Sequence, residues 1–170
     1  MLAVTVIGHD RPGIVAQTTA ALAGLGLNLE DSTMTLLRGH FAFMLVCTGE
    51  AERRQVEDAL APLAADGSLD VSVRTVGPEE AAAPRGAQYQ LAVHGADRPG
   101  IVSALTGVIA DVGGNVTDLS TRLAGHLYVL IAEVDLPAGT QVAALQARLT
   151  EVADGLGVDA ALRPVEADLL

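Results

Sequence analysis

One eight-residue motif occurs twice in this chain. The sequence GHDRPGIV at 8–15 returns 87 residues later as GADRPGIV at 95–102, and seven of the eight positions are identical. A period this long in a chain of 170 residues indicates two copies of one small domain, because the repeats of solenoid proteins are shorter. The fold must therefore be one that a chain can build twice.

The copies match beyond the motif. Asn28 and Asp31 correspond to Asn115 and Asp118 at the same shift of 87 residues. The pair Gly39-His40 matches Gly125-His126 at a shift of 86, which suggests that the second copy lost one residue between Asp118 and Gly125. Segment 77–87 between the copies has two prolines and no apolar periodicity, as a linker does. We predict one domain at 1–76, a linker at 77–87 and a second domain at 88–166.

Each copy predicts the element order β-α-β-β-α-β. A β-rich run ends at the motif, and in the second copy Leu91 and Val93 alternate toward a core. A helix follows, with its apolar stripe at Val15, Thr18, Leu22 and Leu25 and again at Val102, Leu105, Ile109 and Val112. Hairpins are expected at Arg38-Gly39 and Ala124-Gly125, each followed by a second helix and a short strand. The predicted fold class is α+β, with two tandem ferredoxin-like βαββαβ domains packed as a pseudo-symmetric pair.

Composition excludes several classes of function. The net charge is −11 and the chain has no Lys, so direct binding to nucleic acid is not expected. Cys47 is the only cysteine and lies in an apolar run, which predicts a buried side chain and excludes a disulfide framework. No apolar run is long enough for a membrane span and no signal peptide is evident, so we expect no membrane association and a cytoplasmic location.

The histidines give no metal signature. His40 and His126 both follow the glycine of a hairpin and are expected to be turn residues, whereas His9 is replaced by Ala96 in the second copy. No pair of histidines has the spacing of a helical metal site, so we predict no structural metal and no cofactor.

The repeated loop is the candidate binding site. Pro12 and Pro99 suit a first helical turn, Asp10 and Asp97 are placed to cap it, and Gly13 and Gly100 allow close approach to the backbone. A helix N-terminus with accessible amides is a natural site for a carboxylate or phosphate. The alternative is a helix-start signal that binds nothing, with Arg11 and Arg98 simply solvated.

Asn28 and Asn115 open the strand after the first helix. An Asn side chain can donate to a ligand carboxylate and accept from its amine, although an Asn in such a turn can also be purely structural. Asp31 and Asp118 could bind an ammonium group or be solvated. Carboxylates beside free amides suit a zwitterion better than a dianion, which the acidic surface would repel.

These residues resemble the ACT domain family. The strand ending in Asp-Arg-Pro-Gly-Ile-Val, the amphipathic helix and the Asn that opens the next strand carry the resemblance, which covers nearly the whole chain as two tandem copies. The chain is similar to two-ACT-domain proteins of the glycine cleavage system repressor type.

The resemblance implies paired βαββαβ domains that bind a small ligand, usually an amino acid, at their interface. By position, the implied ligand contacts are Asp10, Arg11, Pro12, Gly13, Ile14 and Asn28 in the first copy, and Asp97, Arg98, Pro99, Gly100, Ile101 and Asn115 in the second. No attached catalytic domain is evident, so the implied partners are an amino acid, a separate regulated protein and a second copy in a homodimer.

Two other functions are compatible with the residues. Acylphosphatases share the topology and use an Arg in the first loop together with an Asn, which Arg11 and Asn28 would imitate. However, the sequence shows neither a glycine-rich loop that would bind the phosphate nor a general base, so an enzyme is not expected. The other alternative is an oligomerisation scaffold that binds no ligand.

Overall fold

The chain forms two compact units, residues 1–81 and 82–170. The computed structural model describes residues 1–77 and 86–165, so most of the predicted linker lies outside the described residues. The predicted boundaries at 76 and 88 therefore stay predictions. Each unit has an apolar core of its own and is considered by itself below.

Both units follow the predicted element order. The first consists of β1 (Leu2–His9), α1 (Ile14–Gly24), β2 (Asn28–Leu37), β3 (His40–Thr48), α2 (Arg53–Leu60), the 3₁₀ turn η1 (Ala61–Ala64) and β4 (Leu69–Thr75). The second consists of β5 (Ala87–Ala96), α3 (Ile101–Asp111), β6 (Asn115–Ala124), β7 (Leu127–Leu136), α4 (Val142–Leu156) and β8 (Val158–Pro164). The βαββαβ prediction is confirmed in both copies.

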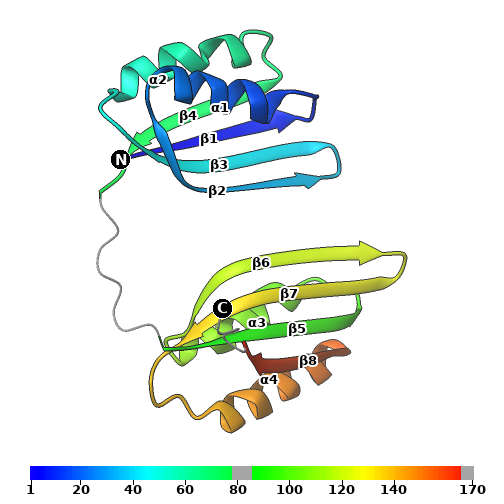
Figure 1. Cartoon of the computed structure of the whole chain (residues 1–170). Coiled ribbons are helices and arrows are strands. Elements are labelled where there is room, and N and C mark those ends of the chain that lie inside the picture. Colours follow the sequence, from blue (N-terminus) through cyan, green and yellow to red (C-terminus); the bar gives the residue numbers. More distant parts are fainter. Residues whose placement is uncertain (78–85, 166–170) are drawn as a thin grey trace. The chain divides into compact units, whose positions relative to one another are not determined.

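Each unit is a four-stranded antiparallel sheet with its helices on one face (Figure 1). The strand order is β2-β3-β1-β4 in the first unit and β6-β7-β5-β8 in the second. Strands β2 and β6 are therefore edge strands at equivalent positions. Every residue of β2 is exposed, including Met34, Leu36 and Leu37, so this edge presents apolar side chains and unpaired backbone groups.

The cores lie between the sheets and the helices. Leu91 and Val93 of β5 are buried as predicted, and Cys47 is also buried. The predicted helical stripe is wrong at its first position. Ile14 and Ile101 are buried, whereas Val15 and Val102 are exposed. The helices begin at these isoleucines, so the stripe runs with a spacing of four from the first helical residue, as in Ile14, Thr18 and Leu22.

The strand register contradicts the proposed deletion. Leu37 pairs with His40 and Ala124 pairs with Leu127, so both hairpins have two-residue turns and the shift of 87 continues through them. In the first turn Arg38 and Gly39 both have positive φ, the pattern of a type I′ turn. In the second, only Gly125 does, the pattern of a type II′ turn. The glycine occupies a different position of each turn, which produced the apparent shift of 86.

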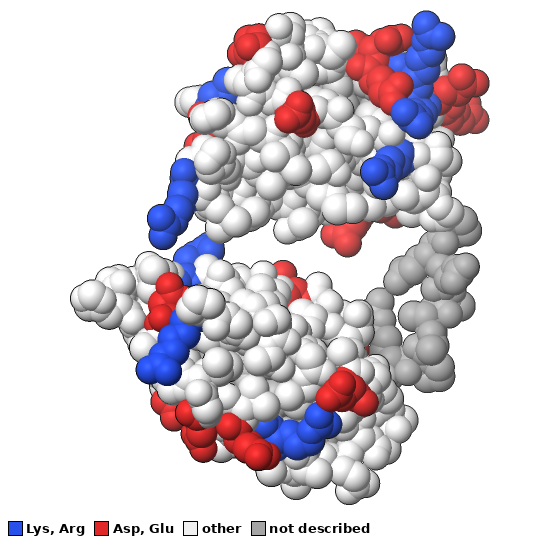
Figure 2. Space-filling view, turned by 180° about the vertical axis from the view of Figure 1, so that it is seen from behind, with Lys and Arg blue, Asp and Glu red and all other residues white. Residues whose placement is uncertain are grey.

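Figure 2 shows the charged side chains on one face of the protein. On the face shown in Figure 2, acidic and basic side chains are interspersed, and Lys and Arg form no broad patch. None of the helices within residues 1–77 and 86–165 is long and apolar enough to cross a membrane.

Candidate functional site

The candidate site is the motif loop, defined as residues 10–14 in the first domain and 97–101 in the second. Gly13 has φ 92° and ψ −4°, and Gly100 has φ 96° and ψ −8°. These values, with Pro at the preceding position, match the third residue of a type II turn. The helix begins only after this turn, so Pro12 and Pro99 precede it instead of opening it.

The predicted aspartate caps are not formed. Gly13 and Gly100 are themselves the N-cap residues of α1 and α3, and neither helix has a side-chain cap. Because the first-turn N–H groups precede any intrahelical acceptor, they stay available to an external acceptor. The motif loop is thus a Pro-Gly turn that presents uncapped amides, in both domains.

Each motif arginine lies near the second helical segment of its domain. Arg11 donates from Nη2 to the carbonyl oxygen of Leu63 and from Nη1 to Oε1 of Gln17, both at 3.3 Å. The guanidinium carbon of Arg98 lies 3.5 Å from where a Cβ on Gly157 would be, beside the C-terminal end of α4. Both guanidinium groups thus lie near the C-terminal end of a helical segment. The helix dipole favours positive charge at that end. The hydrogen bonds of Arg11 support a structural role for this arginine.

The two motif loops differ in what surrounds them. In the first domain the N–H of Asp10 donates to the carbonyl of Gly39 in the hairpin turn at 3.1 Å. In the second domain a pocket of about 360 Å³ opens at the loop, lined by Asp97, Arg98, Gly100, Ile101, Val102, Ser103 and Tyr128. Burial raises the pKa of the Tyr128 phenol, and the negative charge of Asp97 adds to this shift. The register places Phe41 of the first domain at the position of Tyr128, so the phenol is specific to the second loop.

Asn28 and Asn115 lie at the opposite end of their sheets. The pairings align Asn28 with Thr48, next to the start of β1, whereas the motif loop follows the end of β1. The seven residue steps from Leu2 to His9 span roughly 23 Å at the rise of a β-strand. One domain therefore does not bring its own Asn to its own motif loop, and the arrangement of Arg11 with Asn28 that an acylphosphatase requires is not formed within the domain.

Each Asn has a carboxylate and a threonine beside it. Asn28 Nδ2 donates to Glu30 Oε1 at 3.3 Å, and Thr48 Oγ1 donates to the same oxygen at 2.7 Å. Both hydrogen bonds lower the pKa of Glu30, and the bond from Thr48 has the larger effect. In the second domain the two residue types change places. The bulge of β6 carries Thr117 where β2 carries Glu30, and the residue opposite Asn115 on β7 is Asp135 where β3 carries Thr48. No local sequence pattern indicates this exchange, because the two members lie on different strands.

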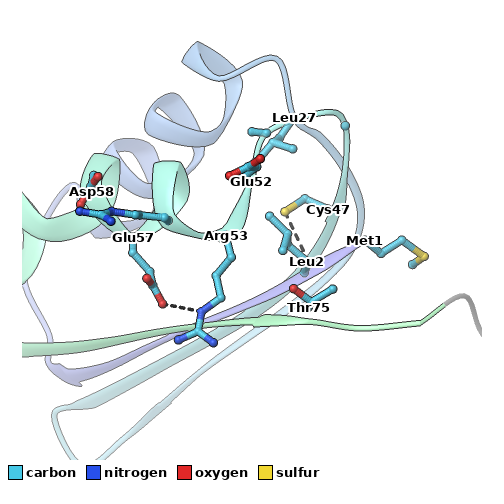
Figure 3. Close-up of a pocket in the computed structure, with 12 residues that line it drawn as sticks. Met1, Leu2, Leu27, Cys47, Glu52, Arg53, Glu57, Asp58 and Thr75 are labelled. Atoms are coloured by element: carbon cyan, nitrogen blue, oxygen red, sulfur yellow. Dashed lines mark hydrogen bonds and ion pairs between the residues drawn. The ribbon is translucent and has the colours of Figure 1, made fainter.

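A larger pocket of about 630 Å³ lies at the same end of the first domain as Asn28 (Figure 3). Leu2, Leu27 and Cys47 form its apolar floor, and Glu52, Arg53, Glu57 and Asp58 of the α2 segment line its rim. Arg53 Nε donates to Glu57 Oε1 at 2.7 Å, and burial raises the pKa of the Cys47 thiol. The charged groups of this pocket are thus partly paired with each other, and the motif loop contributes no residue to the pocket.

Comparison with known proteins decides the family. The model of the ACT domain matches residues 1–74 and 88–163, which is most of the chain and includes both motif loops. The chain belongs to the ACT domain family. It is 28% identical over 124 residues to the glycine cleavage system transcriptional repressor of Escherichia coli, an alignment that covers 71% of this chain and 64% of the relative. This ACT protein thus spans less than two thirds of the length of that relative.

Two solved structures resemble the tandem ACT chain over most of its length. An unknown protein from Galdieria sulphuraria superposes with a TM-score of 0.81 at 31% identity, covering 96% of this chain and 97% of that one. A putative glycine cleavage system transcriptional repressor superposes with a TM-score of 0.72 at 20% identity, covering 96% of each chain. The second likeness shows the fold alone. Both agree with a tandem arrangement of two ACT domains.

Proposed function

We propose that this tandem ACT protein is a regulatory protein that binds an amino acid at an interface between ACT domains and signals to a separate protein. The observation that carries the proposal is the uncapped Pro-Gly turn, which presents first-turn amides in both domains. Such amides, at the positive end of the helix dipole, are suited to a carboxylate. The second motif loop adds a pocket with hydroxyl groups from Ser103 and Tyr128.

The distance within one domain supports an interface site. A small ligand cannot reach both a motif loop and the Asn of the same domain, because roughly 23 Å of strand separates them. If two domains associate through equivalent edges about a two-fold axis, the paired strands are antiparallel. The Asn end of one domain then lies beside the motif-loop end of the other. The exposed apolar side chains of β2 at this edge favour such association.

The polar groups at the two ends match the two halves of an amino acid. The motif amides offer donors for the carboxylate, and the Asn side chain with its neighbouring carboxylate offers acceptors for the ammonium group. An acidic protein disfavours dianionic ligands, which favours a zwitterion. A ligand that binds one arrangement of the domains more tightly shifts the population toward it, and a partner protein can recognise that arrangement. The relative from Escherichia coli is named as a transcriptional repressor, which favours an indirect role in transcription or amino-acid metabolism for this chain.

A thermal-shift scan of the full chain against the twenty common amino acids at millimolar concentration tests the proposal. We expect the midpoint to rise with one amino acid or a few related ones, because a ligand at 100 times its Kd stabilises the folded state by about 2.7 kcal/mol. The double variant Asn28→Ala/Asn115→Ala is expected to lose this rise.

The double variant Thr33→Ala/Ser120→Ala is the matched control, since it changes exposed polar residues at equivalent positions on the same strands. It should keep the rise. A flat scan with the unmodified chain would favour the scaffold without a ligand. A rise that persists in the Asn28→Ala/Asn115→Ala variant would place the ligand elsewhere.

A further inference from the structure

Two histidines face each other across neighbouring strands of the first domain. His9 on β1 and His40 on β3 are register partners, and both are exposed. Their ring centroids lie 5.4 Å apart. They are 31 positions apart in the sequence, so no spacing rule for metal sites could have identified them. His40 also proves to be the first residue of β3, whereas His126 lies in the hairpin turn of the second domain.

The backbone shows what kind of pair this is. The N–H of Asp10 donates to the carbonyl of Gly39. Asp10 directly follows His9, and Gly39 directly precedes His40. In an antiparallel ladder this bond flanks a non-hydrogen-bonded pair, the type in which facing side chains are closest. Register partners also point to the same face of the sheet. Phe41 and Phe43 of β3 are buried under the helices, so His40 and its partner His9 lie on the helix-free face.

The ring separation suits a shared metal ion. Two imidazoles bound to one tetrahedral ion through nitrogens at 2.0–2.1 Å have ring centroids roughly 5 Å apart. Neutral imidazole binds Zn²⁺, Ni²⁺ and Cu²⁺, whereas Mg²⁺ and Ca²⁺ prefer oxygen ligands. The described residues hold no cluster of three or more His, Cys, Asp or Glu side chains that could bind a metal, so an ion bound by this pair would need water at its other coordination positions.

We propose that His9 and His40 form a binding site for a divalent transition-metal ion, and that the ion fixes the end of β1 to the start of β3 next to the first motif loop. The site is independent of the proposed amino-acid function. It is specific to the first domain, because Ala96 and Leu127 are the register partners at this position in the second. The ion would bridge the two strands directly before Asp10, where the motif loop begins.

Isothermal titration of the untagged, chelator-stripped full chain with ZnCl₂, and separately with NiCl₂, tests the site. One ion per chain should bind with micromolar affinity. The variants His9→Ala and His40→Ala should each bind roughly 10²-fold more weakly, because the second imidazole acts at high effective concentration. The controls His94→Ala and His126→Ala should bind as the unmodified chain does. All four histidines are exposed, so circular dichroism in the presence of chelator should show unchanged folding for all four variants.

A gain of binding provides a second test. The double variant Ala96→His/Leu127→His installs the same pair in the second domain, where both positions are exposed, and should raise the stoichiometry from one ion to two. The proposal is overturned if the unmodified chain shows no saturable binding, if His9→Ala and His40→Ala leave the affinity unchanged, or if the installed pair binds no further ion.

Discussion

Replacing Gly8 with alanine is expected to lower the free energy of unfolding of the first domain by about 3 kcal/mol. A Cβ at this position would lie 2.1 Å from the carbonyl oxygen of Ser68 and 2.9 Å from the Cα of Leu69. Both obstacles are backbone atoms, so no side-chain rotation relieves them, and β1 must separate from the start of β4. Urea unfolding followed by circular dichroism measures the loss.

Gly24→Ala is the matched control for Gly8→Ala. Gly24 is the last residue of α1 and a Cβ there meets nothing within 4 Å. Alanine has the higher helix propensity, so this variant should gain about 0.5 kcal/mol. Equal stabilities for the two variants would contradict the close packing of β1 against β4 that positions the motif loop.

Leu105→Ala is expected to destabilise the second domain by about 3 kcal/mol, because it leaves a cavity where a fully buried side chain packs. Leu105 is 0% exposed within the core cluster that α3 and α4 form with the sheet. Urea unfolding gives the size of the loss. Amide hydrogen exchange gives its location, with faster exchange expected at Leu91 and Val93 of β5.

Val102→Ala, one turn earlier on the same helix, is the control for Leu105→Ala. Val102 is 37% exposed, so its truncation should change stability by no more than about 0.5 kcal/mol. Because the two domains have separate cores, exchange at Val4 and Val6 of β1 should be unaffected by Leu105→Ala. A loss below 1 kcal/mol, or equally fast exchange in both domains, would contradict this description of the core.

The fold was predictable because two independent signals agreed. The repeat indicates the number of domains. The element order follows from two patterns, the strand alternation seen at Leu91 and Val93 and the apolar stripe of the helices. The errors were local. Val15 fits the helical spacing as well as Ile14 does, and only the Pro-Gly turn decides where the helix begins. The false deletion arose because a glycine can occupy either position of a two-residue turn.

The candidate site was predictable only in part. The motif indicates a helix N-terminus, but its sequence does not distinguish a capping aspartate from one that precedes a type II turn, as Asp10 does. The contact of Arg11 with Leu63 joins residues 52 positions apart, which no local pattern shows. The same holds for the exchange of Glu30 and Thr48 with Thr117 and Asp135.

A two-dimensional ¹⁵N–¹H spectrum of the full chain, recorded with and without an equimolar mixture of the twenty amino acids, tests whether one amino acid contacts both a motif loop and an Asn. We expect the amide signals of Ile14 and Ile101 in the motif loops to move together with the side-chain NH₂ signals of Asn28 or Asn115, although a strand roughly 23 Å long separates these groups within each domain. Spectra that do not change, or changes confined to the pocket around Arg53, would contradict it.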